Sequence, residues 1–157
     1  MNRIALFADV QNIYYTTRQA FGRQFNYRAL WKLIAARGDI RHATAYATSR
    51  GDDQQIKFQD ALKHIGFDVK LKPYIQRADG SSKGDWDVGI AVDIMTTAPE
   101  VDTIVLLSGD GDFDVLLQRV RDMYNVSTEV YGVPSLTAKS LMDSASTFHP
   151  INEELLL

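Results

Sequence analysis

Aspartates occur in three short segments of the sequence, and their grouping suggests metal chemistry. The first segment contains Asp9, the second contains Asp87, and the third contains Asp110 and Asp112. Carboxylates held close together repel one another and raise each other's pKa unless a cation lies among them. Oxygen ligands without histidine or cysteine partners favour Mg²⁺ or Mn²⁺ over zinc. These residues therefore indicate a divalent-cation site built from aspartates.

Each of these aspartates also has a structural interpretation. Asp87 and Asp112 precede apolar helical stretches, where an aspartate cap stabilises a helix by about 1 kcal/mol. Asp9 and Asp110 are harder to explain in this way, because each follows a buried strand, where an unpaired charge is costly. Asp93, six residues after Asp87, would point about 120° away from it on a regular helix. We therefore expect Asp87 to bind the ion, and Asp93 either to support the ligands from behind or to be an ordinary helix-face residue.

The expected secondary structure would bring these segments to one place. Apolar runs predict strands at 3–9, 41–48, 67–74, 103–107 and 127–131, and apolar periodicity predicts helices at 12–21, 27–36, 53–65, 88–97, 113–124 and 138–145. The polar stretch at 75–84 predicts a loop. This alternation predicts a three-layer α/β/α fold with a mainly parallel sheet of about five strands. Right-handed crossovers would place all the carboxyl ends at one edge, where open sheets bind ligands.

The length and composition narrow the class of protein. We expect one domain over residues 1–157. There is no cysteine, which excludes disulfides and thiolate chemistry and suits the cytoplasm. The N-terminus lacks the layout of a signal peptide, and no apolar stretch approaches the roughly 18 residues of a membrane span.

The charge is unevenly distributed along the chain. The net charge is −3, but residues 1–83 carry +7 and residues 84–157 carry −10. One interpretation is a set of unevenly charged, solvated faces. The other is a basic surface that holds a polyanion beside an acidic pocket that holds metal. Arg18, Arg50, Lys57 and Lys83 are candidates for contacts with such a polyanion, and Tyr14, Tyr15 and Trp86 are candidates either for base stacking or for core packing.

Several other chemistries lack their residues. The sequence contains neither a G-x-x-x-x-G-K-[ST] loop nor a G-x-G-x-x-G turn between a strand and a helix, so these modes of nucleotide binding are excluded. Ser108 has no nucleophile elbow around it and no evident histidine partner. His42, His64 and His149 are scattered and are expected to be surface or packing residues.

Three segments resemble the signature motifs of the NYN domain family, and in particular its bacterial LabA-like branch. They are ADVQNI at 8–13, KGDWDVGIAVD at 83–93 and LLSGDGDFDVLL at 106–117. The family is related to the PIN-like nucleases, so the resemblance implies a PIN-like, Rossmann-like fold and a Mg²⁺- or Mn²⁺-dependent site that cuts RNA. It implies metal-binding and catalytic roles for Asp9, Asp87, Asp110 and Asp112, substrate contacts for Asn12, Ser108 and Lys83, and a supporting role for Asp93.

Three functions follow as hypotheses. The first is a metal-dependent ribonuclease, with DNA as a further possible substrate. The second is an RNA-binding or regulatory module that keeps the fold with little or no activity, and the third is a phosphatase acting on a small molecule. An intact set of acids favours an enzyme, whereas an enclosed pocket would favour a small substrate over a polymer.

Overall fold

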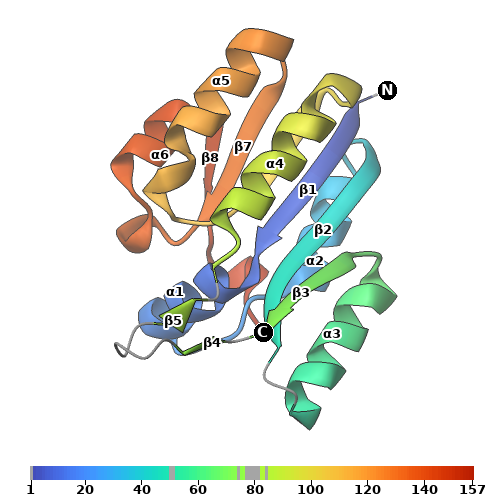
Figure 1. Cartoon of the computed structure of the whole chain (residues 1–157), viewed down its shortest axis with the longest axis vertical. Helices are drawn as coiled ribbons and strands as arrows, with labels where there is room; N and C mark the ends of the chain where they lie inside the picture. Colours follow the sequence, from blue (N-terminus) through green and yellow to red (C-terminus); the bar gives the residue numbers. More distant parts are fainter. Residues whose placement is uncertain (1, 50–51, 74, 77–81, 84) are drawn as a thin grey trace.

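A parallel sheet forms the centre of the molecule in a computed structural model that describes residues 2–49, 52–73, 75–76, 82–83 and 85–157. Within these residues the sheet has six strands in the order β3-β2-β1-β6-β7-β8, and every neighbouring pair is parallel (Figure 1). They are β1 (Arg3–Asp9), β2 (Asp39–Ser49), β3 (Asp68–Pro73), β6 (Thr103–Leu107), β7 (Ser127–Gly132) and β8 (Thr147–Pro150). The chain builds outward from β1 to β3 and then crosses to β6 on the other side of β1. The strand order therefore reverses between β1 and β6, where open parallel sheets bind ligands.

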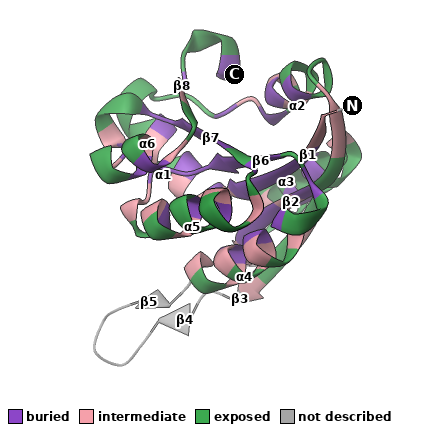
Figure 2. Ribbon diagram, turned by 90° about the horizontal axis from the view of Figure 1, so that it is seen from above, coloured by how far each residue is buried: buried purple, intermediate pink, exposed green. Residues whose placement is uncertain are grey.

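Helices cover both faces of the sheet, which confirms the expected three-layer fold. On one face, α1 (Val10–Phe21), α2 (Tyr27–Ala35) and α3 (Asp53–Ile65) pack with Ile4 and Leu6 of β1. On the other face, α4 (Asp87–Thr97), α5 (Asp114–Tyr124) and α6 (Lys139–Ser144) pack with Ala5 and Phe7. Figure 2 shows the buried residues between the sheet and the helices, with the outer helix surfaces exposed.

The central strands follow directly from the apolar runs. Residues 4–8 of β1 are at most 1% exposed, and all five residues of β6 are buried, as is typical of parallel strands covered on both faces. The helix ends also follow from the sequence. Asn26 caps α2 by accepting a hydrogen bond from the amide of Ala29 at 3.0 Å, and Gly66 ends α3 with a φ of 136°, which glycine adopts without strain.

The structure differs from the expectation at the C-terminal edge strand and in one loop. The sheet has a sixth strand, β8, which was missed because its four residues, TFHP, are half-exposed or exposed and form no apolar run. The expected loop at 75–84 contains two short antiparallel strands, β4 (Ile75–Gln76) and β5 (Ser82–Lys83). Both departures concern strands too short to carry a periodicity signal.

Some boundaries of helices and strands also differ. α1 begins at Val10, directly after β1, and the expected helix at 113–124 is a 3₁₀ turn, η2 (Gly111–Phe113), followed by α5. The described residues contain three further 3₁₀ turns: η1 (Ala98–Glu100), η3 (Pro134–Leu136) and, after the last strand, η4 (Glu153–Leu155). Among the described residues, no helix is long and apolar enough to cross a membrane.

Candidate metal centre

Asp9 and the Ser108–Asp112 segment meet at the point where the strand order reverses. Asp9 is the last residue of β1, and Ser108 directly follows β6. Along β1, side chains alternate between the two faces, so Asp9 points to the same face as Phe7, beneath α4 and α5. α4 itself begins with Asp87. The three acidic segments of the sequence are therefore brought to one edge of the sheet, as expected.

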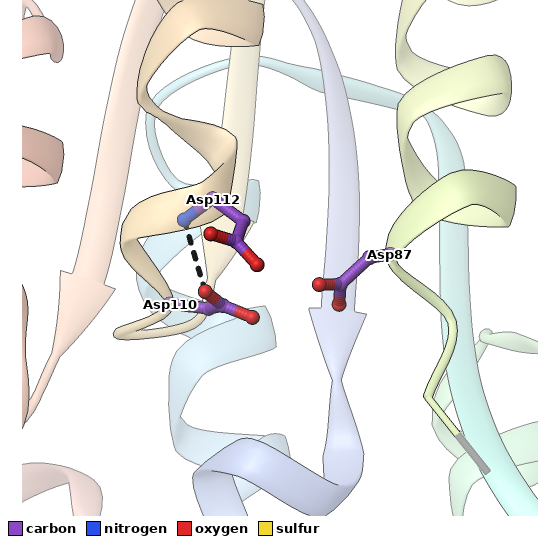
Figure 3. Close-up of side chains that lie close together, drawn as sticks. All are labelled: Asp87, Asp110 and Asp112. Carbon is purple, nitrogen blue, oxygen red and sulfur yellow. Dashed lines mark hydrogen bonds between the residues drawn. The ribbon is translucent and has the colours of Figure 1, made fainter. Parts of the chain in front are cut away.

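Three carboxylates form the closest group at this edge. Asp87, Asp110 and Asp112 each offer one oxygen, and these oxygens all lie within 4.8 Å of one another. Asp87 approaches from α4, whereas Asp110 and Asp112 belong to the turn after β6 (Figure 3). Oδ1 of Asp110 accepts a hydrogen bond from the amide of Asp112 at 2.9 Å, which fixes the turn.

Asp9 lies behind this group and is linked to it through Ser108. The hydroxyl of Ser108 donates to Oδ2 of Asp9 at 3.1 Å and accepts from the amide of Asp110 at 3.2 Å. Burial raises the pKa of Asp9 to about 6, with the hydrogen bond from Ser108 acting in the opposite direction and the charges of Asp110 and Asp85 adding to the rise. Asp9 is thus electrostatically part of the site without being one of the three closest carboxylates.

Asn12 connects the start of α1 to the same turn. Its Oδ1 accepts a hydrogen bond from the amide of Gly109 at 2.9 Å. Gly109 has no room for a side chain, because a Cβ there would lie 2.6 Å from the carbonyl oxygen of Leu136. The contacts of Asn12 and Ser108 therefore tie the end of β1 twice to the turn after β6.

Ser108 has a different position from the one expected for a residue that binds substrate. It has no exposed surface, and its hydroxyl already serves Asp9 and Asp110. A buried side chain of this kind orients its neighbours. The side chain of Lys83, which belongs to β5, and the whole of Arg50 lie outside the described residues.

The surroundings of Asp87 disfavour its charged form. Burial raises its pKa to about 7, and the negative charge of Asp110 and a hydrogen bond to it are the next causes, followed by the charges of Asp85 and Asp9. Neither Asp87 nor Asp112 caps a helix: Trp86 occupies the cap position of α4, and Asp112 lies inside η2. The structural interpretation of these two acids as helix caps is therefore wrong.

Trp86 holds the start of α4 against the sheet. Its indole Nε1 donates to the carbonyl oxygen of Ala47 in β2 at 2.9 Å, and its ring lies 5.4 Å from that of Tyr46. Gly89 is required beneath the ring, because a Cβ there would be 2.6 Å from it. The ammonium group of Lys72 lies 4.5 Å from the ring centroid. This packing fixes the position from which Asp87 reaches the other carboxylates.

Asp93 belongs to a separate cluster further along α4. Its Oδ2 accepts hydrogen bonds from the Tyr46 hydroxyl and from the ammonium group of Lys70, both at 2.7 Å. Burial acts to raise the pKa of Asp93, but these two partners outweigh it and lower the pKa. Of the two roles left open by the sequence, the contacts favour a helix-face residue in an ion pair. The ring of its partner Tyr46 packs on Trp86, the residue before Asp87.

Asp85 adds negative charge to the site, although it was not among the candidate residues of the sequence. Its negative charge raises the pKa of both Asp9 and Asp87, and its carbonyl oxygen accepts a hydrogen bond from Lys72 at 3.2 Å. The available signal was its place in the G-D-W-D stretch, two residues before Asp87.

The arrangement fits a hard divalent cation. Within the described part of the chain, no ion pair joins Asp87, Asp110 or Asp112 to a lysine or arginine. The oxygens come only from carboxylates, the donor set that suits Mg²⁺ or Mn²⁺. The spacing of the three carboxylates and the raised pKa of Asp87 are the properties expected of ligands before a cation joins them.

Comparisons with known proteins agree with this picture. A sequence model of the NYN domain matches residues 3–152. The low amplitude and bright protein LabA of Synechococcus elongatus is 30% identical over 160 residues, covering 97% of this chain and 85% of that protein. The crystal structure of a protein of unknown function, VPA0982, from Vibrio parahaemolyticus has a TM-score of 0.95 at 47% identity, covering 99% of this chain and 96% of that one.

Proposed function

Because the chain belongs to the NYN domain family of PIN-like nuclease domains, we propose that it is a ribonuclease that hydrolyses phosphodiester bonds with the help of Mg²⁺ or Mn²⁺. The observation that carries this proposal is the group of three carboxylate oxygens within 4.8 Å of one another, at the edge where the strand order reverses. A helix cap or a surface ion pair would not require such a group.

Four carboxylates of the chain would bind the cation. Asp87, Asp110 and Asp112, with Asp9 behind them, would hold the cation. When bound, such a cation supplies an activated water and offsets the charge that develops on the phosphate.

The other site residues would keep these carboxylates in place. Ser108 and Asn12 fix the turn that carries Asp110, and Trp86 fixes the helix that carries Asp87. Lys83 remains a candidate for contact with a phosphate. The exposure of Asp112 and the half-burial of its two partners leave the group open on one side, which suits a polymer better than a small, enclosed substrate.

The proposal is tested by incubating the protein with single-stranded RNA, structured RNA and DNA, each with Mn²⁺, with Mg²⁺ or with a chelator. Asp9→Asn keeps the size of a candidate ligand and removes its charge, and Asp60→Asn, an exposed change on α3, is the matched control. We expect cation-dependent RNA cleavage that survives Asp60→Asn and not Asp9→Asn. RNA binding without any cation-dependent cleavage would instead establish the binding-module hypothesis.

A further inference from the structure

α1 presents two tyrosines and an arginine on its outer surface. Tyr14 and Tyr15 are 42% and 50% exposed, and their rings lie edge to face with centroids 5.4 Å apart. The guanidinium carbon of Arg18 lies 5.7 Å from the centroid of the Tyr14 ring, and an Nη1 hydrogen bond to the Tyr14 hydroxyl holds it there. Together these three residues form what we call the α1 platform.

The fold does not account for this arrangement. α1 packs on the sheet through Val10, Ile13 and Thr17, which are at most 7% exposed. The tyrosines lie on other sides of the helix, and exposed aromatic rings add little to the core. Trp86, the third aromatic residue singled out from the sequence, differs, because its indole nitrogen is bonded to Ala47 and Lys72 lies over its ring. Trp86 is therefore a packing residue, whereas the rings of Tyr14 and Tyr15 are exposed.

The helix that carries the α1 platform starts at the same edge of the sheet as the carboxylates. α1 begins immediately after Asp9, at the end of the sheet toward which β1 runs (Figure 1). Asn12 is bonded to the amide of Gly109, the residue before Asp110, and Tyr15 follows Asn12 by one helical turn. Residues three apart on a helix are surface neighbours, about 5–6 Å apart at Cβ. A chain bound at the carboxylates would therefore pass within reach of Tyr15.

The charge of this surface suits a polyanion. α1 contains no acidic residue, and Arg18 forms no ion pair with a carboxylate among the described residues. Aromatic rings beside a guanidinium are the combination that binds single-stranded nucleic acid, because unpaired bases stack on the rings while the cation meets the phosphates. In a duplex the bases are already stacked on each other and do not offer their faces.

We propose that Tyr14, Tyr15 and Arg18 form a subsite that stacks unpaired bases beside the carboxylates, so that the substrate is a single strand or an unpaired segment. The biological role of this subsite rests on the proposed nuclease function, but the binding of RNA to the subsite does not require cleavage. It can therefore be measured in a chelator, where cleavage plays no part.

The experiment measures the dissociation constants of three fluorescently labelled RNA probes by anisotropy. One probe is a 12-nucleotide single strand, one is its duplex, and one is a single strand of the same length with abasic sites. Tyr14→Ala and Tyr15→Ala remove rings, Tyr15→Phe keeps one, and Met123→Ala is the control, a change of an exposed residue near the far end of α5. Light scattering of each variant records its oligomeric state, and a melting curve confirms that it is folded.

We expect each alanine variant to bind the base-containing single strand roughly 5- to 150-fold more weakly, with Tyr15→Phe and Met123→Ala close to wild type. Binding of the duplex and of the abasic strand should change little. Unchanged binding in both alanine variants, an equal loss for the abasic strand, or no RNA binding by the wild type would overturn the proposal. A change in oligomeric state in place of RNA affinity would also overturn it and assign the α1 platform to a protein interface. If the wild type binds as expected but never cleaves, the subsite stands and the nuclease function fails.

Discussion

The hydroxyl of Ser108 donates a hydrogen bond to Oδ2 of Asp9 at 3.1 Å, across 99 residues of sequence. This hydrogen bond joins the two central strands of the sheet at their carboxyl ends. The same hydroxyl accepts a hydrogen bond from the amide of Asp110. The buried hydroxyl of Ser108 therefore links the carboxylate of Asp9 to the turn that carries Asp110 and Asp112. The geometry of the site depends on this contact, and the contact can be removed without introducing bulk.

Ser108→Ala should lower both stability and cation affinity. The change removes the hydroxyl that accepts from the amide of Asp110 and donates to the carboxylate of Asp9, at a cost of roughly 1–3 kcal/mol of unfolding free energy. Denaturant unfolding and Mn²⁺ titration would measure the two effects, with the exposed change Ser135→Ala as control. Equal values for Ser108→Ala and wild type would show that the hydroxyl does not position the site.

The metal-free protein should lose stability as the pH rises from 5 to 8. The folded-state pKa values of Asp9, about 6, and of Asp87, about 7, lie above the value of about 4 that an unfolded aspartate has. The folded protein therefore binds more protons than the unfolded chain in this range, so these two groups favour folding at low pH and oppose it above their folded pKa values. Melting curves in chelator should show this slope, and Asp87→Asn should reduce it. A wild-type slope no steeper than that of Asp87→Asn would contradict the raised pKa of Asp87.

Gly89→Ala should destabilise the protein although it lies within a helix. Replacing a helical glycine by alanine ordinarily stabilises by about 1 kcal/mol. Here the new Cβ would lie 2.6 Å from the Trp86 ring, so either the indole or the first turn of α4 must move, and Asp87 with it. Thermal melting and Mn²⁺ affinity should both fall, while Val92→Ala, an exposed change on the same helix, should have little effect on either. A Gly89→Ala protein more stable than wild type would show that the Trp86 ring can move aside without loss of stability.

Arg37→Met should destabilise the fold without affecting the site. Glu129 on β7 is 6% exposed and accepts hydrogen bonds from both Nη atoms of Arg37 and one with His149. Burial acts to raise the pKa of Glu129, but the hydrogen bonds from Arg37 and His149 outweigh burial, so the pKa is lowered. The ionised Glu129 therefore stabilises the fold at neutral pH, and this contribution is lost as the pH falls through its folded-state pKa. We expect a loss of roughly 1–3 kcal/mol at pH 7 that shrinks at acid pH. A loss that grows as the pH falls would reverse this assignment.

Much of the fold could be predicted because its signals are local. The buried runs of β1 and β6 each depend on a few adjacent residues, and both strands are confirmed. The ends of α2 and α3 depend in the same way on single residues, Asn26 and Gly66. β8 could not be predicted, because its four residues gain their place only by pairing with β7. A strand of that length has no periodicity of its own to detect.

The convergence of three acidic segments could be predicted, but the part played by Asp85 and the internal order of the site could not. Asp110 and Asp112 follow β6, and Asp87, at the start of α4, reaches the same edge of the sheet. The placing of Asp9 behind Ser108, and of Asp93 in an ion pair with Lys70, depends on side-chain partners from distant segments. The spacing of residues along the sequence does not predict which side chains from distant segments become partners.

RNA cleavage under single-turnover conditions, measured beside equilibrium RNA binding, tests the central claim most directly. The proteins to compare are wild type, Asp87→Asn and the control Asp60→Asn, each with Mn²⁺ and with chelator. The account predicts that Asp87→Asn folds, binds RNA within a fewfold of wild type and loses cleavage by several orders of magnitude, because the loss of a cation ligand removes several kcal/mol of barrier lowering. Wild-type protein that binds RNA but shows no Mn²⁺-dependent cleavage above the Asp87→Asn background would contradict it.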